Sequence, residues 1–267
     1  MITSTANAQI KQIRKLRDRK ERQQTGLFFG EGVRIVGEAV ERGWDVQALI
    51  VAPELLTSTY ARQLLKQADR RRVLEVSAEV FRSISSKDGP QGIAAMVRQR
   101  WTPLEQVRPK AGELWVALDS VADPGNLGTI LRTHDAVGGA GVILLDHSTD
   151  PYDPSAIRAS MGAVFSQQLV RASFEEFAAW KRRLQIPVFG TDGEAEADYH
   201  QVAYPDPMVL LMGSERLGLL EHHLALCDEV LRIPMVGRSD SLNLAVATGI
   251  LLYEIFNQRR DRQRPAG

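Results

Sequence analysis

Five short apolar runs between residues 113 and 267 constrain the fold more than any other feature of this sequence. Each is about as long as one β-strand, and helical patterns near 126–137, 154–160 and 173–183 separate them. Runs of Val, Leu and Ile without polar alternation are typical of strands that are covered on both faces. The sequence therefore predicts an α/β fold with a parallel sheet. The five runs are LWVALD (114–119), GVILLD (141–146), PVFG (187–190), MVLLMG (208–213) and DEVLRI (228–233).

The last apolar segment, 241–257, predicts a helix that is apolar nearly all round. Such a helix must be buried on several sides, either in the core or against a second subunit. An earlier helix has a defined start, because Ser173-Phe-Glu-Glu176 is a capping-box pattern. We expect all of these elements to belong to one domain that spans 113–267.

The first 112 residues have a different organisation. Residues 1–25 contain a predicted helix over 5–22 with a narrow apolar stripe. Residues 26–98 alternate short strands and helices, which predicts a smaller α/β domain. Residues 99–112 hold two prolines and no periodicity, so we expect a linker there. Within the smaller domain the predicted helices are 31–42, 59–69 and one that Ser77 caps, and the predicted strands start at Phe28 and cover 46–52, 73–76 and 93–98.

The net charge of zero conceals two basic ends. Residues 1–25 carry seven Lys or Arg side chains and two acidic ones. Basic ends can bind a polyanion, since each Lys or Arg at a phosphate releases counterions. A solvated helix face is the alternative interpretation, and charge alone does not decide between the two. The basic side chains of the tail are Arg259, Arg260, Arg262 and Arg264, against the single acid Asp261.

Composition narrows the class of protein further. An apolar fraction of 44% and a charged fraction of 25% are ordinary for a soluble globular chain. The single cysteine, Cys227, cannot form an internal disulfide, which favours a reducing cytoplasm. No apolar run approaches the ~18 residues of a membrane span, and the N-terminal residues lack the apolar core of a secretory signal. We expect a soluble cytoplasmic protein with no membrane partner.

Several kinds of functional site lack their motifs. The sequence has no G-x-x-x-x-G-K-[ST], so no P-loop is predicted. Gly125-Asn-Leu-Gly128 follows a predicted strand but lacks the G-x-G-x-x-G spacing, which disfavours a dinucleotide cofactor. There is no G-x-S-x-G nucleophile motif. His222, His223 and Cys227 lack a fourth partner at ligand spacing, so we predict no metal.

Three polar segments remain, and each follows a predicted strand, where open α/β sheets bind ligands. The first contains Asn126 and Arg132, and in the plainer interpretation these are a helix cap and a surface arginine. The second, Gly213-Ser-Glu215-Arg-Leu-Gly218, is compatible with an ordinary turn.

The third polar segment, 233–244, leads into the apolar last helix. Its polar residues are Ser239, Ser241 and Asn243. A helix needs only one of them as its N-cap, so we interpret the segment as part of a site.

Together the three segments resemble the signature motifs of the SpoU family, which are ribose 2′-O-methyltransferases of RNA in the SPOUT superfamily. The patterns are N-x-G-x-x-x-R-T, L-x-G-S-E-x-x-G and I-P-M-x-G-x-x-x-S-L-N, in that order. Arg132 and Glu215 are 83 positions apart, and Glu215 and Ser241 are 26 apart, which fits the family. The resemblance covers 113–257. Residues 27–98, with Glu31-Gly-Val-Arg34 and Gly89-Pro-Gln-Gly92, resemble the ribosomal-protein-like RNA-binding domain (L30e-like) that often precedes it.

The resemblance implies a trefoil-knotted catalytic domain, an exception to the rule that chains are not knotted. It implies that the cofactor is S-adenosyl-L-methionine, held largely by backbone groups, and that the protein is a homodimer through its C-terminal domain. The implied cofactor-binding residues are Gly213, Ile233, Leu242, Leu211, Met212, Met235 and Asn243. The implied catalytic residues are Arg132, Asn126, Glu215, Ser241 and Asn243.

A ribose 2′-hydroxyl is a poor nucleophile near neutral pH, so the enzyme must align it and stabilise the developing alkoxide. A guanidinium does not normally deprotonate in proteins. We therefore expect Arg132 to clamp a phosphate and stabilise the alkoxide rather than act as the base. Asn126 would orient Arg132 or the ribose, and Glu215, Ser241 and Asn243 would fix Arg132, the substrate or the cofactor. The residues expected to contact RNA are Arg34, Arg158, Lys11 and Arg14.

The sequence is compatible with more than one function. The resemblance of residues 27–98 favours ribosomal RNA of the 23S type as substrate. A tRNA substrate is the alternative among RNA 2′-O-methyltransferases. A catalytically inactive RNA-binding or ribosome-assembly protein is a second alternative, although no matched functional residue is lost. Three residues depart from the family pattern, namely Arg216, His134 and Ala245, and they leave substrate specificity open.

Overall fold

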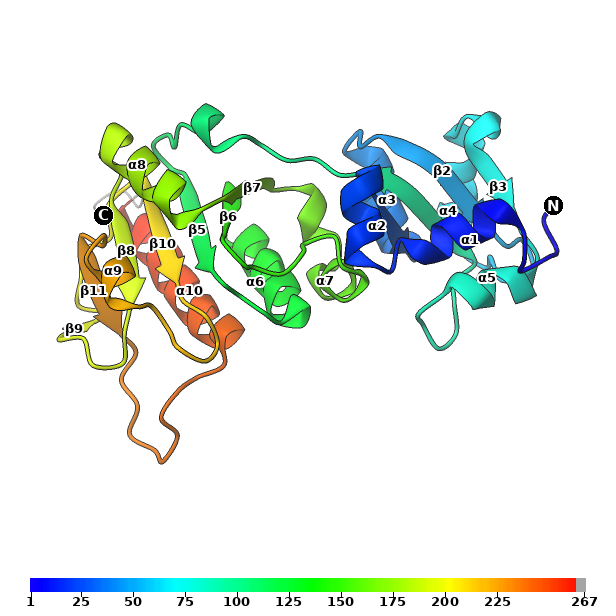
Figure 1. The fold of residues 1–267 in the computed structure, drawn as a ribbon. Helices are drawn as coiled ribbons and strands as arrows, with labels where there is room; N and C mark the ends of the chain where they lie inside the picture. The colour runs from blue at the N-terminus through cyan, green and yellow to red at the C-terminus, as the bar shows by residue number, and fades with distance from the viewer. Residues whose placement is uncertain (263–267) are drawn as a thin grey trace. The chain divides into compact units, whose positions relative to one another are not determined.

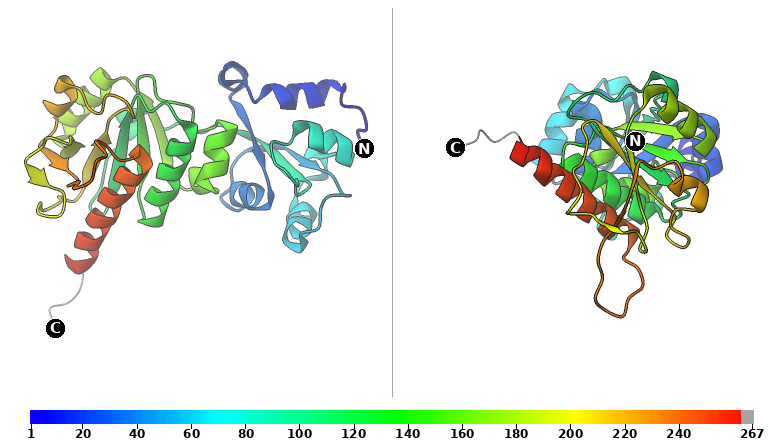
Figure 2. Two further views of the ribbon diagram at one scale, coloured as in Figure 1. Left: turned by 90° about the horizontal axis from the view of Figure 1, so that it is seen from below. Right: turned by 90° about the vertical axis from the view of Figure 1, so that its left-hand side faces the viewer.

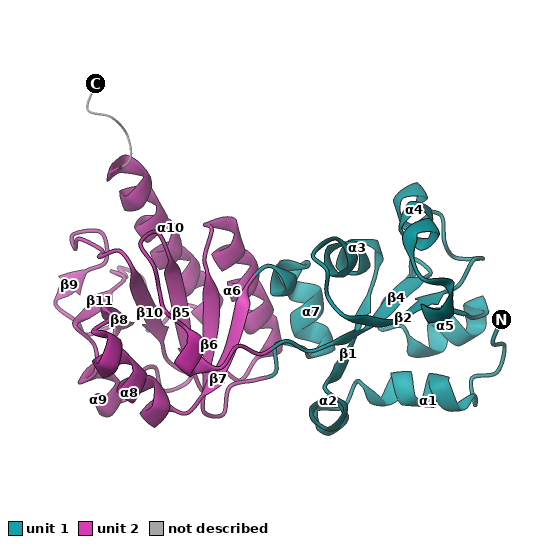
Figure 3. Ribbon diagram, turned by 90° about the horizontal axis from the view of Figure 1, so that it is seen from above, with its two compact units in different colours: residues 1–100, 150–166 teal, residues 101–149, 167–267 magenta. Residues whose placement is uncertain are grey.

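A computed structural model describes residues 1–262, and the chain divides into two compact units (Figure 3). Unit 1 contains Met1–Arg100 and Asp150–Ser166, and unit 2 contains Trp101–Thr149 and the chain from Gln167 onward. Residues 150–166 therefore belong to unit 1. The sequence analysis had placed them in the C-terminal domain 113–267. Arg264 of the predicted basic tail lies outside the described residues.

Unit 1 is built on a four-stranded mixed sheet in the order β1-β4-β2-β3. β4 is antiparallel to β1 and β2, while β2 and β3 are parallel. The elements of its N-terminal part are α1 (Ala8–Lys15), α2 (Arg19–Thr25), β1 (Leu27–Glu31), α3 (Val33–Glu41), β2 (Val46–Val51), α4 (Thr59–Gln67), η1 (Arg70–Arg72), β3 (Val73–Glu75), α5 (Ala78–Ile84) and β4 (Ile93–Arg98). Ser77 caps α5 through the Val80 amide, as predicted.

The predicted single helix over 5–22 is wrong, because the chain breaks between α1 and α2. Ile10, Ile13 and Leu16 are buried in one apolar cluster with residues of α5 and the sheet. The Arg22 guanidinium donates hydrogen bonds to the Leu16 and Arg17 carbonyl oxygens, at 3.0 and 2.7 Å. These bonds satisfy carbonyls that a continuous helix would have used, so they stabilise the break.

The segment 150–166 contains α7 (Pro154–Ser160) and η3 (Ala163–Phe165) and packs into unit 1. Arg22 forms an ion pair of 2.7 Å with Asp150, and both side chains are almost fully buried. The Tyr152 ring stacks on Phe28 with a centroid distance of 4.7 Å. The buried ion pair and the ring stacking together fix this segment on the rest of unit 1.

Unit 2 is built on a seven-stranded sheet in the order β7-β6-β5-β10-β8-β11-β9, and every pairing in it is parallel. This confirms the predicted parallel α/β fold. The strands are β5 (Leu114–Asp119), β6 (Gly141–Leu145), β7 (Gln168–Ala172), β8 (Val188–Thr191), β9 (Ala197–Asp198), β10 (Met208–Met212) and β11 (Glu229–Arg232). The helical elements are η2 (Leu104–Gln106), α6 (Pro124–Ala136), α8 (Phe174–Leu184), α9 (Glu221–Leu224) and α10 (Leu244–Arg262).

Helices cover both faces of this sheet (Figure 1). Phe177 and Trp180 of α8 join an apolar cluster with strand residues such as Trp115. The predicted capping box is confirmed, because Ser173 and Glu176 exchange both bonds at the start of α8. On the other face α6 and α10 lie side by side (Figure 2).

Four elements of unit 2 were not predicted from the sequence, namely η2, β7, β9 and α9. The elements η2, β9 and α9 have four residues or fewer, and β7 and β9 are the two edge strands of the sheet. An edge strand is covered less than a central one, so its sequence lacks a continuous apolar run. Among residues 1–262, no helix is both long enough and apolar enough to cross a membrane.

Candidate cofactor and substrate site

The site begins at the point where the strand order of unit 2 changes direction. β5 and β10 are neighbours in the sheet, but the chain continues from β5 to one side and reaches β10 from the other. Loops that leave two such strands diverge and open a crevice at their carboxyl ends. The first and second polar segments are these two loops, so the topology brings them together.

Asn126 joins all three polar segments. Its Nδ2 donates a hydrogen bond of 3.1 Å to Oε1 of Glu215. Its Oδ1 accepts a hydrogen bond of 3.0 Å from Nδ2 of Asn243. One amide side chain on α6 thus contacts the loop after β10 and the residue that precedes α10.

The interpretation of Asn126 as an ordinary helix cap is wrong. Asp123 caps α6, since its carboxylate accepts a hydrogen bond of 2.8 Å from the backbone N–H of Asn126. Asn243 caps α10, because its Oδ1 accepts from the amides of Ala245 and Val246. The last helix therefore begins at Leu244, three residues later than predicted, and continues to Arg262.

Glu215 is held by four donors from the first segment and its own loop. The Ala122 and Asp123 amides donate to its carboxylate at 3.0 and 3.2 Å. Partial burial raises the pKa of Glu215, but the bonds from the Ala122 amide, the Asn126 side chain, its own amide and the Asp123 amide outweigh that effect and leave the pKa below its usual value. Glu215 is accordingly ionised and committed to positioning these two loops.

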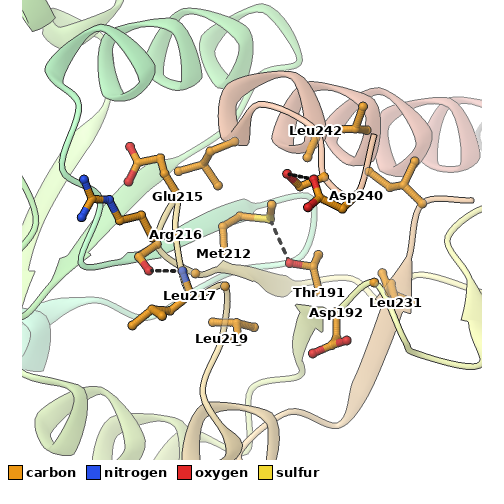
Figure 4. Close-up of a pocket in the computed structure, with 18 of the residues that line it drawn as sticks. Thr191, Asp192, Met212, Glu215, Arg216, Leu217, Leu219, Leu231, Asp240 and Leu242 are labelled. Atoms are coloured by element: carbon orange, nitrogen blue, oxygen red, sulfur yellow. Dashed lines mark hydrogen bonds between the residues drawn. The ribbon is translucent and has the colours of Figure 1, made fainter. Parts of the chain in front are cut away.

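A cavity of about 430 Å³ lies beside this network (Figure 4). The loop after β10, the end of β8 and the segment before α10 enclose it. Five of the residues predicted to bind the cofactor line the cavity, namely Met212, Gly213, Ile233, Met235 and Leu242. Glu215 and Ser241, predicted as catalytic, also line it.

The other predicted residues lie outside the lining. Leu211 is fully buried inside β10. Asn126 hydrogen-bonds Glu215, which lines the cavity, and Asn243 hydrogen-bonds Asn126 and caps α10. Arg132 lies on α6, one and a half helical turns after Asn126, with an exposed side chain. Within residues 1–262 its guanidinium makes no hydrogen bond or ion pair, so Glu215 does not fix it directly.

The cavity also contains Thr191, Asp192 and Gly193, which end or follow β8 and which the sequence motifs did not include. The Thr191 hydroxyl lies 3.9 Å from the Met212 sulfur. A signal for them was present, because the polar sequence Thr191-Asp-Gly193 directly follows the predicted strand 187–190 at the ligand-binding edge of the sheet.

The four residues predicted to contact RNA all lie in unit 1. Arg34 and Arg158 line one cavity, which contains residues from both parts of that unit. Lys11 is exposed on α1. Arg14 donates a hydrogen bond of 3.0 Å to the Ser83 hydroxyl and is partly buried. The structure thus brings Arg34 and Arg158 together but not the other two.

His223, the buried histidine of the pair near Cys227, has a contact at each of its ring nitrogens. Nδ1 of His223 accepts from the Leu220 amide at 3.0 Å, and its Nε2 lies 3.7 Å from the Asp119 carboxylate. Burial lowers the pKa of His223 and raises that of Asp119. Within residues 1–262, no group of three or more His, Cys, Asp or Glu side chains could hold a metal ion.

The lining of the unit 2 cavity fits S-adenosyl-L-methionine. The volume of the cavity lies within the range of about 300–1,000 Å³ that is usual for small-molecule pockets. Met212, Leu219 and Leu231 provide apolar walls for an adenine ring. The Asp192 carboxylate and the Ser241 hydroxyl provide acceptors for ribose hydroxyls and an ammonium group.

A parallel α/β sheet with a cofactor-sized cavity at the carboxyl ends of β8, β10 and β11 defines a class, the small-molecule-binding doubly wound proteins. Comparison with known proteins then makes the assignment specific. The model of the SpoU rRNA Methylase family matches residues 113–253, and that of the MRM3-like substrate binding domain matches residues 7–95. This chain belongs to the SpoU rRNA methylase family.

Two curated relatives and one solved structure are similar over nearly the whole chain. A 23S rRNA (uridine(2479)-2′-O)-methyltransferase of Streptomyces viridochromogenes is 33% identical, covering 96% of this chain and 92% of the relative. The 23S rRNA (guanosine(2553)-2′-O)-methyltransferase RlmP of Bacillus subtilis is 30% identical, covering 95% and 98%. The crystal structure of an AdoMet-bound rRNA methyltransferase from Sinorhizobium meliloti is 40% identical, with a TM-score of 0.88 and 98% of each chain covered.

Proposed function

We propose that this protein transfers a methyl group from S-adenosyl-L-methionine to a ribose 2′-hydroxyl of 23S ribosomal RNA. The observation that carries the proposal is the network around Asn126. It joins all three SpoU motifs beside a cavity that is lined by the residues expected to bind the cofactor. The curated relatives are named for this reaction on two different nucleotides of 23S rRNA.

The chain's own residues have to position the hydroxyl and stabilise charge, because a bound sulfonium already supplies an activated methyl group. The Arg132 guanidinium is exposed and has no hydrogen-bond or ion-pair partner among residues 1–262, so it can bind a phosphate and the developing alkoxide. It does not take the proton, since guanidinium stays protonated, and the proton passes to phosphate or water. Glu215 and Asn126 keep the loop after β10 in place while this happens.

A homodimer is part of the proposal. Along α10, Val246 and Tyr253 are 53% and 47% exposed, and Ile250 between them is partly exposed. These residues are spaced by four and three, so they form one apolar stripe on a helix whose other side is buried in unit 2. A second copy of the chain would cover this stripe.

The remaining proposals concern organisation. We infer that residues 26–98 bind the RNA substrate, that 1–25 form a basic addition to them, and that 99–112 link them to a methyltransferase domain over 113–267. We also infer a trefoil knot in that domain, which a crystal structure traced through residues 213–262 tests. Fractionation of cells tests the expected cytoplasmic location.

Methyl transfer from radiolabelled S-adenosyl-L-methionine to separated rRNA and tRNA from a strain that lacks this protein tests the function. Label in 23S rRNA at one site that resists alkaline cleavage is the expected result. Label in tRNA alone would move the substrate to the alternative class. If the cofactor does not bind, the enzyme assignment fails and an RNA-binding role replaces it.

A further inference from the structure

Unit 1 contains a second cavity, of about 590 Å³, that the three SpoU signature segments do not line. Its walls come from the start of α3, the loop 85–91, Tyr60 of α4 and the segment 150–166. The residues used in the argument are Arg34, Tyr60, Lys87, Arg158, Glu38 and Glu41, all of which line it. The cavity therefore combines residues from the substrate-binding match with two from the SpoU match, Arg158 and Met161.

The walls are held by buried and hydrogen-bonded groups. The Glu31 carboxylate is 7% exposed and accepts from the Ser85 hydroxyl at 2.6 Å and from the Ser86 amide at 3.1 Å. Lys87 Nζ donates to the Glu31 carbonyl oxygen at 3.2 Å. Gly162 packs so closely on Glu38 that a Cβ there would lie 2.9 Å from the Glu38 Cγ. The cavity is therefore formed before any ligand binds.

Two basic side chains of the cavity are not used by the fold. Arg34 and Arg158 are exposed, and neither makes a hydrogen bond or ion pair with another described residue. By contrast, Arg42, which caps the C-terminus of the helix that contains Arg34, is paired with Glu38 at 2.8 Å. Two unpaired guanidiniums in one cavity provide a site for phosphate oxygens, which they bind in a bidentate manner.

The remaining lining favours a nucleotide over a simple anion. Tyr60 is 37% exposed and presents a ring on which a base can stack. Its hydroxyl donates to Glu41, and this bond together with burial raises the pKa of Tyr60 to about 12, so the ring stays neutral. Glu38 and Glu41 would repel a bare anion but accept hydrogen bonds from the N–H groups of a base.

We propose that this cavity binds one unstacked nucleotide of the RNA substrate, with backbone phosphate on Arg34 and Arg158 and the base against Tyr60. The inference rests on the proposed function for the identity of the RNA. It gives residues 150–166 a role in substrate binding, because Arg158 belongs to the segment that Arg22 and Asp150 fix on unit 1.

The first test measures binding of 23S rRNA from a strain that lacks this protein as a function of salt concentration. Arg34→Ala and Arg158→Ala should each weaken binding about 3–10-fold and reduce the slope of log K against log salt by about 0.7, the value for one contact to a single strand. Arg82→Ala is the matched control, because Arg82 is exposed in unit 1 and does not line the cavity. If the two variants bind like this control, the proposal is wrong.

The second test locates the nucleotide. Irradiation of the protein with 4-thiouridine-substituted 23S rRNA should crosslink the peptide that contains Tyr60 or the one that contains Met161, which also lines the cavity. The crosslink should disappear in the Arg34→Ala, Arg158→Ala double variant and persist in Arg82→Ala. Crosslinks that map only outside the cavity would overturn the proposal.

Failure of the inference and failure of the proposed function are separable. Methyl transfer by the unaltered protein reports on the function alone. If it methylates 23S rRNA while Arg34→Ala and Arg158→Ala retain the affinity and activity of the control, only the inference fails. If it does not methylate RNA but shows the predicted arginine-dependent salt slopes and crosslinks, only the function fails.

Discussion

Asn126 Nδ2 lies 3.1 Å from Glu215 Oε1, although the two residues are 89 positions apart in the chain. The same side chain accepts a hydrogen bond from Asn243, which caps the last helix. Asn and Glu are complementary here, because the amide has both a donor and an acceptor while the carboxylate only accepts. The three motifs of the family are thus one hydrogen-bonded unit.

Asn126→Asp should disrupt this hydrogen-bonded unit, although the Asn and Asp side chains are almost the same size. The variant loses the donor to Glu215 and places two carboxylates within hydrogen-bond distance, which raises the pKa of one of them. We expect cofactor affinity to fall about 10-fold or more, measured by calorimetry with S-adenosyl-L-methionine. Thr129→Ala is the control, because its hydroxyl bonds only the Gly125 carbonyl within α6. Equal affinities for the two variants would contradict the role of Asn126.

Arg132→Ala should abolish turnover and leave cofactor binding intact. Arg132 lies outside the cavity lining, and removal of one group that stabilises charge in a transition state costs about 10²–10³-fold in kcat. Single-turnover methyl transfer and calorimetry check the two halves of this prediction. Loss of cofactor binding would show that Arg132 acts in the cofactor site instead.

The exposed stripe on α10 predicts an oligomeric state that depends on Tyr253. Tyr253→Arg should convert a dimer to a monomer, because a charge in an apolar interface must be desolvated without a partner. Sedimentation velocity measures the change directly. Leu220→Glu is a matched control, since Leu220 is 44% exposed and Tyr253 is 47% exposed, but Leu220 lies at the start of α9. A monomeric unaltered protein, or dissociation of both variants, would refute the assigned interface.

Arg22→Ala should destabilise unit 1 by about 3–5 kcal/mol, the usual effect of leaving a buried charge without its partner. The charge left behind is Asp150, whose side chain is 4% exposed. Denaturant unfolding measures the loss, and Lys20→Ala, at an exposed position on the same helix, should change stability by less than about 0.5 kcal/mol. Asp150→Asn added to Arg22→Ala should recover part of the loss. A similar effect of the two single variants would be inconsistent with a buried ion pair.

His134 predicts that stability falls as the pH is lowered. The ring is fully buried, 2.8 Å from the Gln167 side-chain oxygen and 3.0 Å from the Leu114 carbonyl oxygen. Burial lowers the pKa of His134 in the folded protein, although both contacts oppose this shift. The unfolded chain therefore binds a proton near pH 6.5 that the folded chain does not, and the stabilisation present above that pH is lost below it.

Thermal unfolding measured between about pH 8 and pH 5, a range that includes the ordinary pKa of histidine, checks this prediction. His134→Gln should lower the Tm at pH 8, because a buried hydrogen bond is lost, but its Tm should decrease less on acidification. His222→Gln, at an exposed histidine, is the control and should keep the pH dependence of the unaltered protein. An unchanged pH dependence in His134→Gln would show that another group is responsible.

Local patterns were sufficient for most of the elements. The runs at 114–119 and 93–98 are strands with the predicted bounds, and Ser77 and Ser173 cap the predicted helices. These features depend on residues within one or two turns of each other, so the sequence contains them completely. The break after α1 could not be predicted, because the Arg22 guanidinium that stabilises it is itself held by Asp150.

The sequence by itself determined the parallel α/β fold and the residues of the three motifs, since apolar runs and motif spacing are properties of the chain. Only the tertiary structure decided what those residues do together. It showed that Asp123 rather than Asn126 caps α6, that Glu215 binds Asn126 rather than Arg132, and that Arg34 and Arg158 share a cavity. The physical reason is that hydrogen bonds and cavities depend on distances between residues far apart in the chain, and strand order sets those distances.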